Sequence, residues 1–352
     1  MPRSKRLPPS TDSLSSPVTR RDFLQTSVAA GVALSAWPVW AEAKDAPKVT
    51  GSPETLVKKL FDSLNEAQRK EVCFAWDYVD PKRGLLRTRV ANNWNITKPI
   101  INSDAYTDDQ RAIIKGIFEG MIQPDWHARF YKQLDDDAGG FGEEQSFAIF
   151  GEPGSGKFEF VMTGRHMTIR CDGDSADHVA FGGPIFYGHA CEGFYEKGTH
   201  DGNVFWHQGL AANKLYEMLD GKHRKVALIE KAPAEQQVAF HGKSTLSGLP
   251  VTELSADQKG HLQKVLQLLV EPYRQSDRDE VAKCLKSQGG LDACTISFYQ
   301  KDNKGENADV GNDGVWDNWR LEGPSFVWNY RGAPHVHVWV NIADDSGVKT
   351  NS

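Results

Sequence analysis

Apolar side chains recur along this chain with two different periods. Spacings of three and four residues, typical of amphipathic helices, predict helices at 52–64, 108–121, 126–134, 206–219, 256–270 and 277–287. Aromatic and β-branched runs between glycines and prolines predict strands at 146–150, 158–171, 179–187, 316–322, 326–331 and 335–342. Because helices and strands come in blocks rather than in alternation, the pattern predicts an α+β fold, with an antiparallel β-sheet core and flanking helices.

The predicted strand at 335–342 has the cleanest alternation of apolar and polar residues. Its apolar face, which we expect to be buried, consists of Val336, Val338, Val340 and Ile342. Its other face consists of His335, His337, Trp339 and Asn341. His335 and His337 point the same way and are close enough to share one metal ion, and imidazole suits zinc, copper, iron or nickel. The alternative is a face that is simply in contact with water.

The predicted strand at 158–171 changes its pattern at Gly164, where the apolar positions shift by one residue. A β-bulge at this glycine produces such a shift. The bulge would place His166 on the polar face as a third metal ligand. Arg165 beside it is a candidate catalytic residue that clamps an anion; a surface ion pair is the alternative.

His189 and Glu192 follow the predicted strand at 179–187. Strand ends commonly lead into loops that carry functional residues. His189 is a candidate fourth metal ligand, and Glu192 is a candidate catalytic acid or base. A structural or solvated role is the alternative for each of them.

Two further patterns favour ordinary surface structure. The segment from Gly151 to Lys157 fits the start of a nucleotide-binding P-loop, but Phe158 stands where Ser or Thr should hold Mg²⁺. Strand-like alternation follows it instead of a helix, so we expect a hairpin turn and no ATP site. The acidic run at 135–137 is interpreted as a solvated turn rather than a catalytic pair.

The first 43 residues have the order of an export signal. Basic and Ser-rich residues precede Arg20 and Arg21, and an apolar run follows that ends in small residues. The paired arginines predict the twin-arginine type, so we expect the translocation machinery to bind them and the mature protein to be periplasmic or secreted. That route carries folded proteins, often with a cofactor in place. We expect a signal peptide at 1–43, a linker at 44–54, one α+β domain at 55–345 and a C-terminal tail at 346–352.

Charge and cysteine content narrow the class of protein further. The net charge of −6 argues against nucleic-acid binding, which needs a basic face. The mature chain has no apolar stretch of about eighteen residues, so no membrane span is expected. An exported chain can keep disulfides, and spacing favours Cys284 with Cys294, then Cys171 with Cys191.

Several segments together resemble a bacterial family, the domain of unknown function numbered 3500. These segments lie at 147–153, 164–167, 184–188, 319–324 and 335–337. They span most of 55–345, so the resemblance implies one domain and places the site near these segments. The family often has Gly-His-His where this chain has Gly164, Arg165 and His166, which removes one candidate ligand.

Three functions are compatible with these patterns. The first is an exported metalloenzyme, an oxidoreductase or a hydrolase, with copper or zinc on His166, His335 and His337 and with His189 nearby. The second is a metal-free protein that binds a carbohydrate or a small anion in a groove lined by Trp319, Trp328, Trp339 and Arg165. The third is a hydrolase that uses histidine and glutamate as acid and base without a metal.

Overall fold

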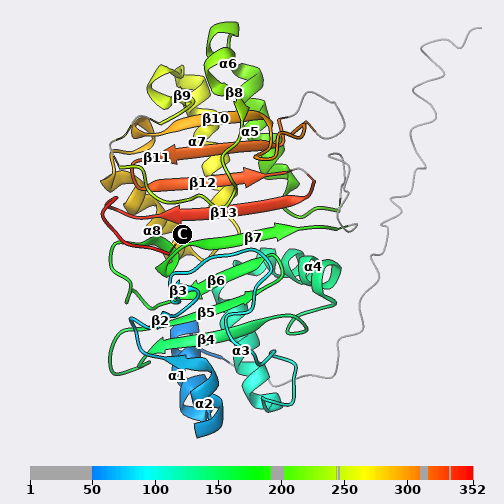
Figure 1. The fold of residues 1–352 in the computed structure, drawn as a ribbon, viewed down its shortest axis with the longest axis vertical. Coiled ribbons are helices and arrows are strands. Elements are labelled where there is room, and N and C mark those ends of the chain that lie inside the picture. Colours follow the sequence, from blue (N-terminus) through cyan, green and yellow to red (C-terminus); the bar gives the residue numbers. More distant parts are fainter. Residues whose placement is uncertain are drawn as a thin grey trace, which may run out of the picture. The chain divides into compact units, whose positions relative to one another are not determined.

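A single mixed sheet forms the centre of the fold. In the computed structural model, which describes residues 50–191, 202–242, 244, 246–309, 316–332 and 334–351, eleven strands pair in the order β1-β4-β5-β6-β7-β13-β12-β11-β10-β8, with β9 beside β10 (Figure 1). The strands are β1 (Cys73–Phe74), β4 (Ser146–Gly151), β5 (Phe158–Gly164), β6 (Met167–Cys171), β7 (Ile185–His189), β8 (Leu228–Lys231), β9 (Leu249–Pro250), β10 (Thr295–Lys301), β11 (Asn318–Gly323), β12 (Phe326–Arg331) and β13 (Val336–Ile342). A separate small hairpin joins β2 (Val79–Asp80) to β3 (Gly84–Leu85).

Most strand pairs in the large sheet are antiparallel. Only the short pairs β1–β4 and β8–β10 are parallel within the described residues. The helices are α1 (Pro53–Ser63), α2 (Glu66–Val72), α3 (Asp108–Met121), α4 (His127–Ala138), α5 (Trp206–Met218), α6 (Gly221–Ala227), α7 (Ala256–Val270) and α8 (Gln275–Ser287). The α+β prediction is therefore confirmed.

The sheet has two different faces. One face, here called the helix face, packs against the helices and carries the main apolar core, which includes Val336, Val338, Trp328 and Trp319. In Figure 1, α7 passes behind the strands on this side. The opposite face, here called the loop face, carries Phe150, Phe186 and Trp339 in two smaller clusters under loop residues such as Leu86 and Val238. Loops therefore replace helices as the cover of the second face.

The expected strand at 158–171 is a hairpin. β5 and β6 pair antiparallel, with Gly164 opposite Met167, so only Arg165 and His166 connect them. Cross-strand partners point to the same face, so the reversal of direction shifts the apolar positions by one. The predicted β-bulge at Gly164 is wrong, because a two-residue turn produces the same shift in the sequence.

Other predicted elements need smaller corrections. The strand expected at 179–187 begins only at Ile185, after a short 3-10 turn at Ala180–Gly182. The hairpin expected after Gly151 is confirmed, since Gly151 pairs with Phe158 across the turn. The strand Thr295–Lys301 was not predicted at all, although it pairs with three neighbours.

The cysteines do not form the expected disulfides. Cys73, Cys171, Cys284 and Cys294 lie outside any disulfide, so neither the 284–294 pair nor the 171–191 pair forms. The Cys171 thiol points to the helix face and donates to the Glu54 carboxylate, while the Cys294 sulfur accepts from Gln288. Cys171 and Cys294 are thus directed to polar neighbours rather than to another cysteine.

Residues Pro47–Ser352 form one compact unit. The proposed signal segment with Arg20 and Arg21 lies outside the described residues, and so does Glu192. Among the described helices, none combines the length and the apolar character needed to cross a membrane.

Candidate metal centre

Three of the four histidines expected as metal ligands lie together. His166, His335 and His337 each offer a ring nitrogen, and these nitrogens lie within 4.8 Å of one another. The Nε2 atom of His337 is 3.0 Å from Nε2 of His166 and 2.9 Å from Nε2 of His335. All three side chains are buried. Two nitrogens bound to one tetrahedral zinc ion are separated by about 3.3 Å, so a small outward shift of the rings would accommodate a common ion.

The register of three neighbouring strands explains this convergence. His337 in β13 lies opposite Gly188 in β7, and Tyr187 lies opposite Met167 in β6. Continuing that register by one residue brings His166 opposite Gly188. His166 and His337 therefore approach each other from either side of the same glycine, from strands about 10 Å apart. His335 joins them because it precedes His337 by two residues and points to the same face.

Gly188 makes room for the His166 ring. A methyl group at this position would lie 3.2 Å from His166 Cδ2 and 2.3 Å from the carbonyl oxygen of Val336. A glycine inside a strand often marks such a close approach. The sequence contains this glycine, but no local pattern shows that two histidines lie on either side of it.

The tight turn between β5 and β6 positions His166. Its φ is +52°, in the left-handed region that non-glycine residues seldom adopt, although histidine is enriched there. Its backbone N–H donates to Asn93 Oδ1 at 3.3 Å. Neighbouring structure therefore stabilises an unfavourable backbone conformation that directs the imidazole onto the loop face.

Carboxylates bind the far side of two of the rings. His166 Nδ1 donates to Asp137 Oδ2 at 2.8 Å, and His337 Nδ1 donates to Glu235 Oε2 at 3.1 Å. Asp137 lies in the last turn of α4 and also accepts from the backbone N–H of Ala190 at 3.1 Å. The interpretation of 135–137 as a solvated turn is wrong for Asp137, whose side chain is fully buried. A charge run at a helix end gave no sign of this burial.

These contacts determine the protonation of the rings. Burial raises the pKa of Asp137, but the hydrogen bond and charge of His166 outweigh it and hold that pKa below 3.8. An ionised carboxylate only accepts, so Nδ1 of His166 carries a hydrogen. Burial lowers the pKa of His335 to about 3 and that of His337 well below 6.5, assisted by the charge of Arg331. His335 and His337 are therefore neutral, as metal ligands must be.

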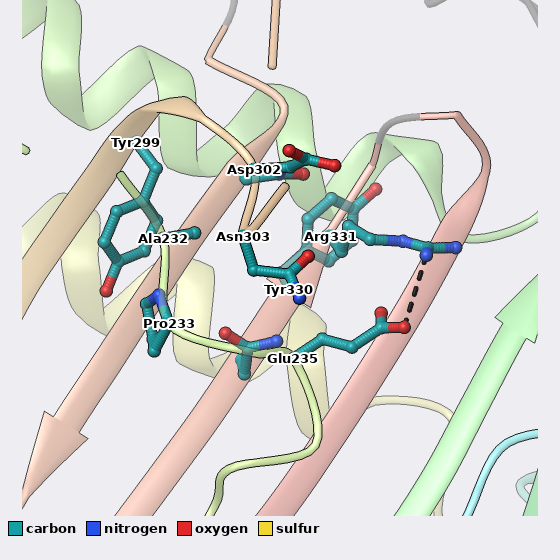
Figure 2. A pocket seen from close by; sticks show the side chains of 10 residues that line it. Ala232, Pro233, Glu235, Tyr299, Asp302, Asn303, Tyr330 and Arg331 are labelled. Carbon is teal, nitrogen blue, oxygen red and sulfur yellow. Dashed lines mark hydrogen bonds and ion pairs between the residues drawn. The ribbon is translucent and has the colours of Figure 1, made fainter. Parts of the chain in front are cut away.

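Glu235 is shared between a ligand and an arginine. Its carboxylate pairs with Arg331 Nη1 at 3.3 Å in addition to His337, and it lines a small pocket with Tyr299 and Asp302 (Figure 2). Burial raises the pKa of Glu235 above 4.5, while the charge of Arg331 opposes that rise. Glu235 comes from the loop after β8, and no pattern in the sequence pointed to it.

His189 does not join the other histidines. Its neighbour Gly188 points to the loop face, so His189 points to the helix side of the sheet. There its Nε2 donates to Asp136 Oδ2 at 3.0 Å, and its Nδ1 accepts from the N–H of Val204 at 3.1 Å. Both ring nitrogens have hydrogen-bond partners, and the bond to Asp136 connects the end of β7 to α4.

Arg165 lies in the turn beside His166. Its Nε is 3.8 Å from Asp137 Oδ1, and a quarter of its side chain is exposed. The arginine is therefore adjacent to the three histidines and in contact with the same carboxylate as His166.

Comparison with known proteins places the chain in a family. The family model described as "Protein of unknown function (DUF3500)" matches residues 49–340. The chain belongs to the DUF3500 family. No curated protein and no solved structure matches it.

The segments that carry the DUF3500 resemblance surround the histidines. The turn with His166, the end of β7 with Gly188, and the start of β13 with His337 are three of them. By contrast, Trp319 and Trp328 are fully buried on the helix face, opposite Trp339. A stacking groove that combines these three tryptophans is therefore not formed in this DUF3500 chain.

Proposed function

We propose that this protein is a metalloenzyme that binds one ion on the Nε2 atoms of His166, His335 and His337. The observation that carries the proposal is the 3.0 Å separation of two Nε2 atoms, on His166 and His337, whose Nδ1 atoms both donate to carboxylates. When both rings are neutral, this arrangement leaves no hydrogen between those nitrogens. A cation between them removes the repulsion of the lone pairs.

The ligand set favours zinc or copper. Three neutral imidazoles suit both metals, and carboxylates behind metal-bound histidines fix the ring orientation and raise ligand basicity. Three protein ligands leave a coordination position for water or substrate, which is typical of catalytic rather than structural sites. Such an ion would supply Lewis-acid chemistry for hydrolysis if it is zinc, or electron transfer if it is copper.

Residues of the chain would support that chemistry in distinct ways. Asp137 and Glu235 would hold the rings of His166 and His337 in one tautomer. Arg165, beside His166, would bind an anionic group of the substrate. Glu192 stays a candidate acid or base from the sequence alone.

Metal analysis tests the proposal. Protein purified from the exported fraction should contain close to one equivalent of zinc or copper, and His337→Gln should lose it. His189→Gln is the matched control, because it removes a buried imidazole outside the group of three and should retain the metal. Equal metal content in wild type and His337→Gln would contradict the proposal, as would a folded wild type that takes up neither metal.

The export expectation supplies the compartment for this function. We propose that Arg20 and Arg21 direct the folded protein out of the cytoplasm. Replacing both with lysine should leave the unprocessed chain in the cytoplasmic fraction. Normal export of that variant would exclude the twin-arginine route.

A further inference from the structure

Two loops that hold the histidines also enclose a polar hollow. The hollow has a volume of about 490 Å³ and is lined by Arg89, Asn92, Glu235, Gln236, Trp339 and Asn351. The first loop contacts His166 through Asn93, and the second contacts His337 through Glu235. The hollow therefore adjoins the group of three histidines, and its volume suits a small organic molecule.

The charges at this hollow are not balanced. Glu235 is already paired with Arg331 and His337. Arg89 has no ion pair among the described residues: its Nη1 donates to the carbonyl of Arg83 at 3.3 Å, and its Nε has no hydrogen-bond partner there. The hollow is thus lined by Arg89, whose charge is not matched by a carboxylate among the described residues.

Arg89 is held in place by its surroundings. The buried Arg170 donates from Nη2 to the carbonyl of Arg89 at 2.7 Å, and Arg170 itself is paired with Glu159. The guanidinium of Arg89 lies over the ring of Trp94, at 5.7 Å from its centroid. A fixed backbone and an aromatic support reduce the ordering that a ligand would otherwise impose.

We infer that this hollow binds a small organic acid, with the carboxylate of the acid on Arg89 and its polar remainder among Asn92, Gln236 and Asn351. Guanidinium groups match carboxylates in geometry and charge, and amide side chains accept or donate to hydroxyl and carbonyl groups. The role of the acid as substrate rests on the proposed metal centre. Binding in the hollow itself does not depend on the metal.

Calorimetric titration of the full mature protein tests the inference. Acetate, lactate and succinate are the acidic probes, and glycerol and glucose are the uncharged ones. We expect at least one acid to bind with a Kd below about 1 mM and the uncharged probes to bind at least tenfold more weakly. Failure of all three acids, or equal binding of glucose, would overturn the inference on wild-type protein alone.

Two arginine variants locate the binding. Arg89→Gln should weaken binding of the acid about tenfold or more. Arg129→Gln is the matched control, since Arg129 also lies over a tryptophan ring, at 4.4 Å from Trp126, and should bind as the wild type does. Unchanged binding in Arg89→Gln would overturn the assignment.

Metal content, measured in the same samples, separates the two proposals. A metal-free wild type that binds acid through Arg89 would contradict the metal-centre proposal and support acid binding in the hollow. A metal-loaded wild type that binds no acid would contradict acid binding in the hollow and support the metal-centre proposal.

Discussion

Around the three histidines, the two faces of the sheet are equally buried but differ in chemistry. On β13, Val338 has an exposed fraction of 0% on the helix face, and His337 has 3% on the loop face. Valine there is surrounded by apolar side chains, whereas His337 contacts two imidazoles and a carboxylate. Burial therefore does not distinguish core from site in this protein. The partners of each buried group make that distinction.

The faces also differ in what stabilises them. Apolar burial on the helix face contributes about 25 cal/mol per Å². Buried polar groups on the loop face cost free energy unless they are paired, and Glu159 there pairs with both Arg170 and Arg87. We therefore expect changes on the helix face to reduce stability and changes around the histidines to reduce metal binding.

Trp328→Ala should have the largest effect on stability. Removing this fully buried ring leaves a cavity on the helix face and should lower the free energy of unfolding by about 3–5 kcal/mol, measured by urea denaturation. The folded fraction should keep its metal, because Trp328 does not contact the histidines. A variant of normal stability that lacks metal would reverse the assignment of the two faces.

Gly188→Ala should affect both properties. The added methyl group meets the Val336 carbonyl and crowds His166, so we expect a loss of about 1–3 kcal/mol in unfolding free energy, together with reduced metal content. Gly156→Ala is the control, since nothing lies within 4 Å of a methyl group there. If Gly188→Ala binds metal as the wild type does, the close approach of the two rings over this glycine is not needed.

Asp137→Asn should act mainly on metal affinity. The amide cannot replace the charged acceptor of His166, and changes of this kind reduce metal affinity about 10–100-fold. Asp135→Asn, in the same helical turn but exposed, should have no effect. Competition with a chromophoric chelator measures the metal affinity of both variants. Equal affinities of Asp137→Asn and the wild type would show that Asp137 does not position His166.

The sequence allowed the alternation of β13 to be predicted because period two is a local property. The alternation assigned Val336 to one face of the strand and His337 to the opposite face, and both assignments agree with the structure. The position of His166 was harder, since a bulge and a two-residue turn shift the apolar pattern in the same way. Only the pairing of Gly164 with Met167 distinguishes them.

Contacts between distant segments were not predictable. Asp137 reaches His166 across 29 residues of chain, and Glu235 reaches His337 across 102. The acidic run at 135–137 is typical of a solvated surface, and Glu235 lies in a loop without a motif. The direction of His189 followed from the register of β7 with β13, which no local pattern contains.

The pairing of β7 with β13 has a consequence for when the proposed metal centre can form. His166 and His337 are separated by 171 residues, and the second of them lies in the last strand of the sheet. A chain that lacks the segment from His335 onward has only one of the three imidazoles. The proposed metal centre therefore needs β13 paired with β7 before three imidazoles can share one ion.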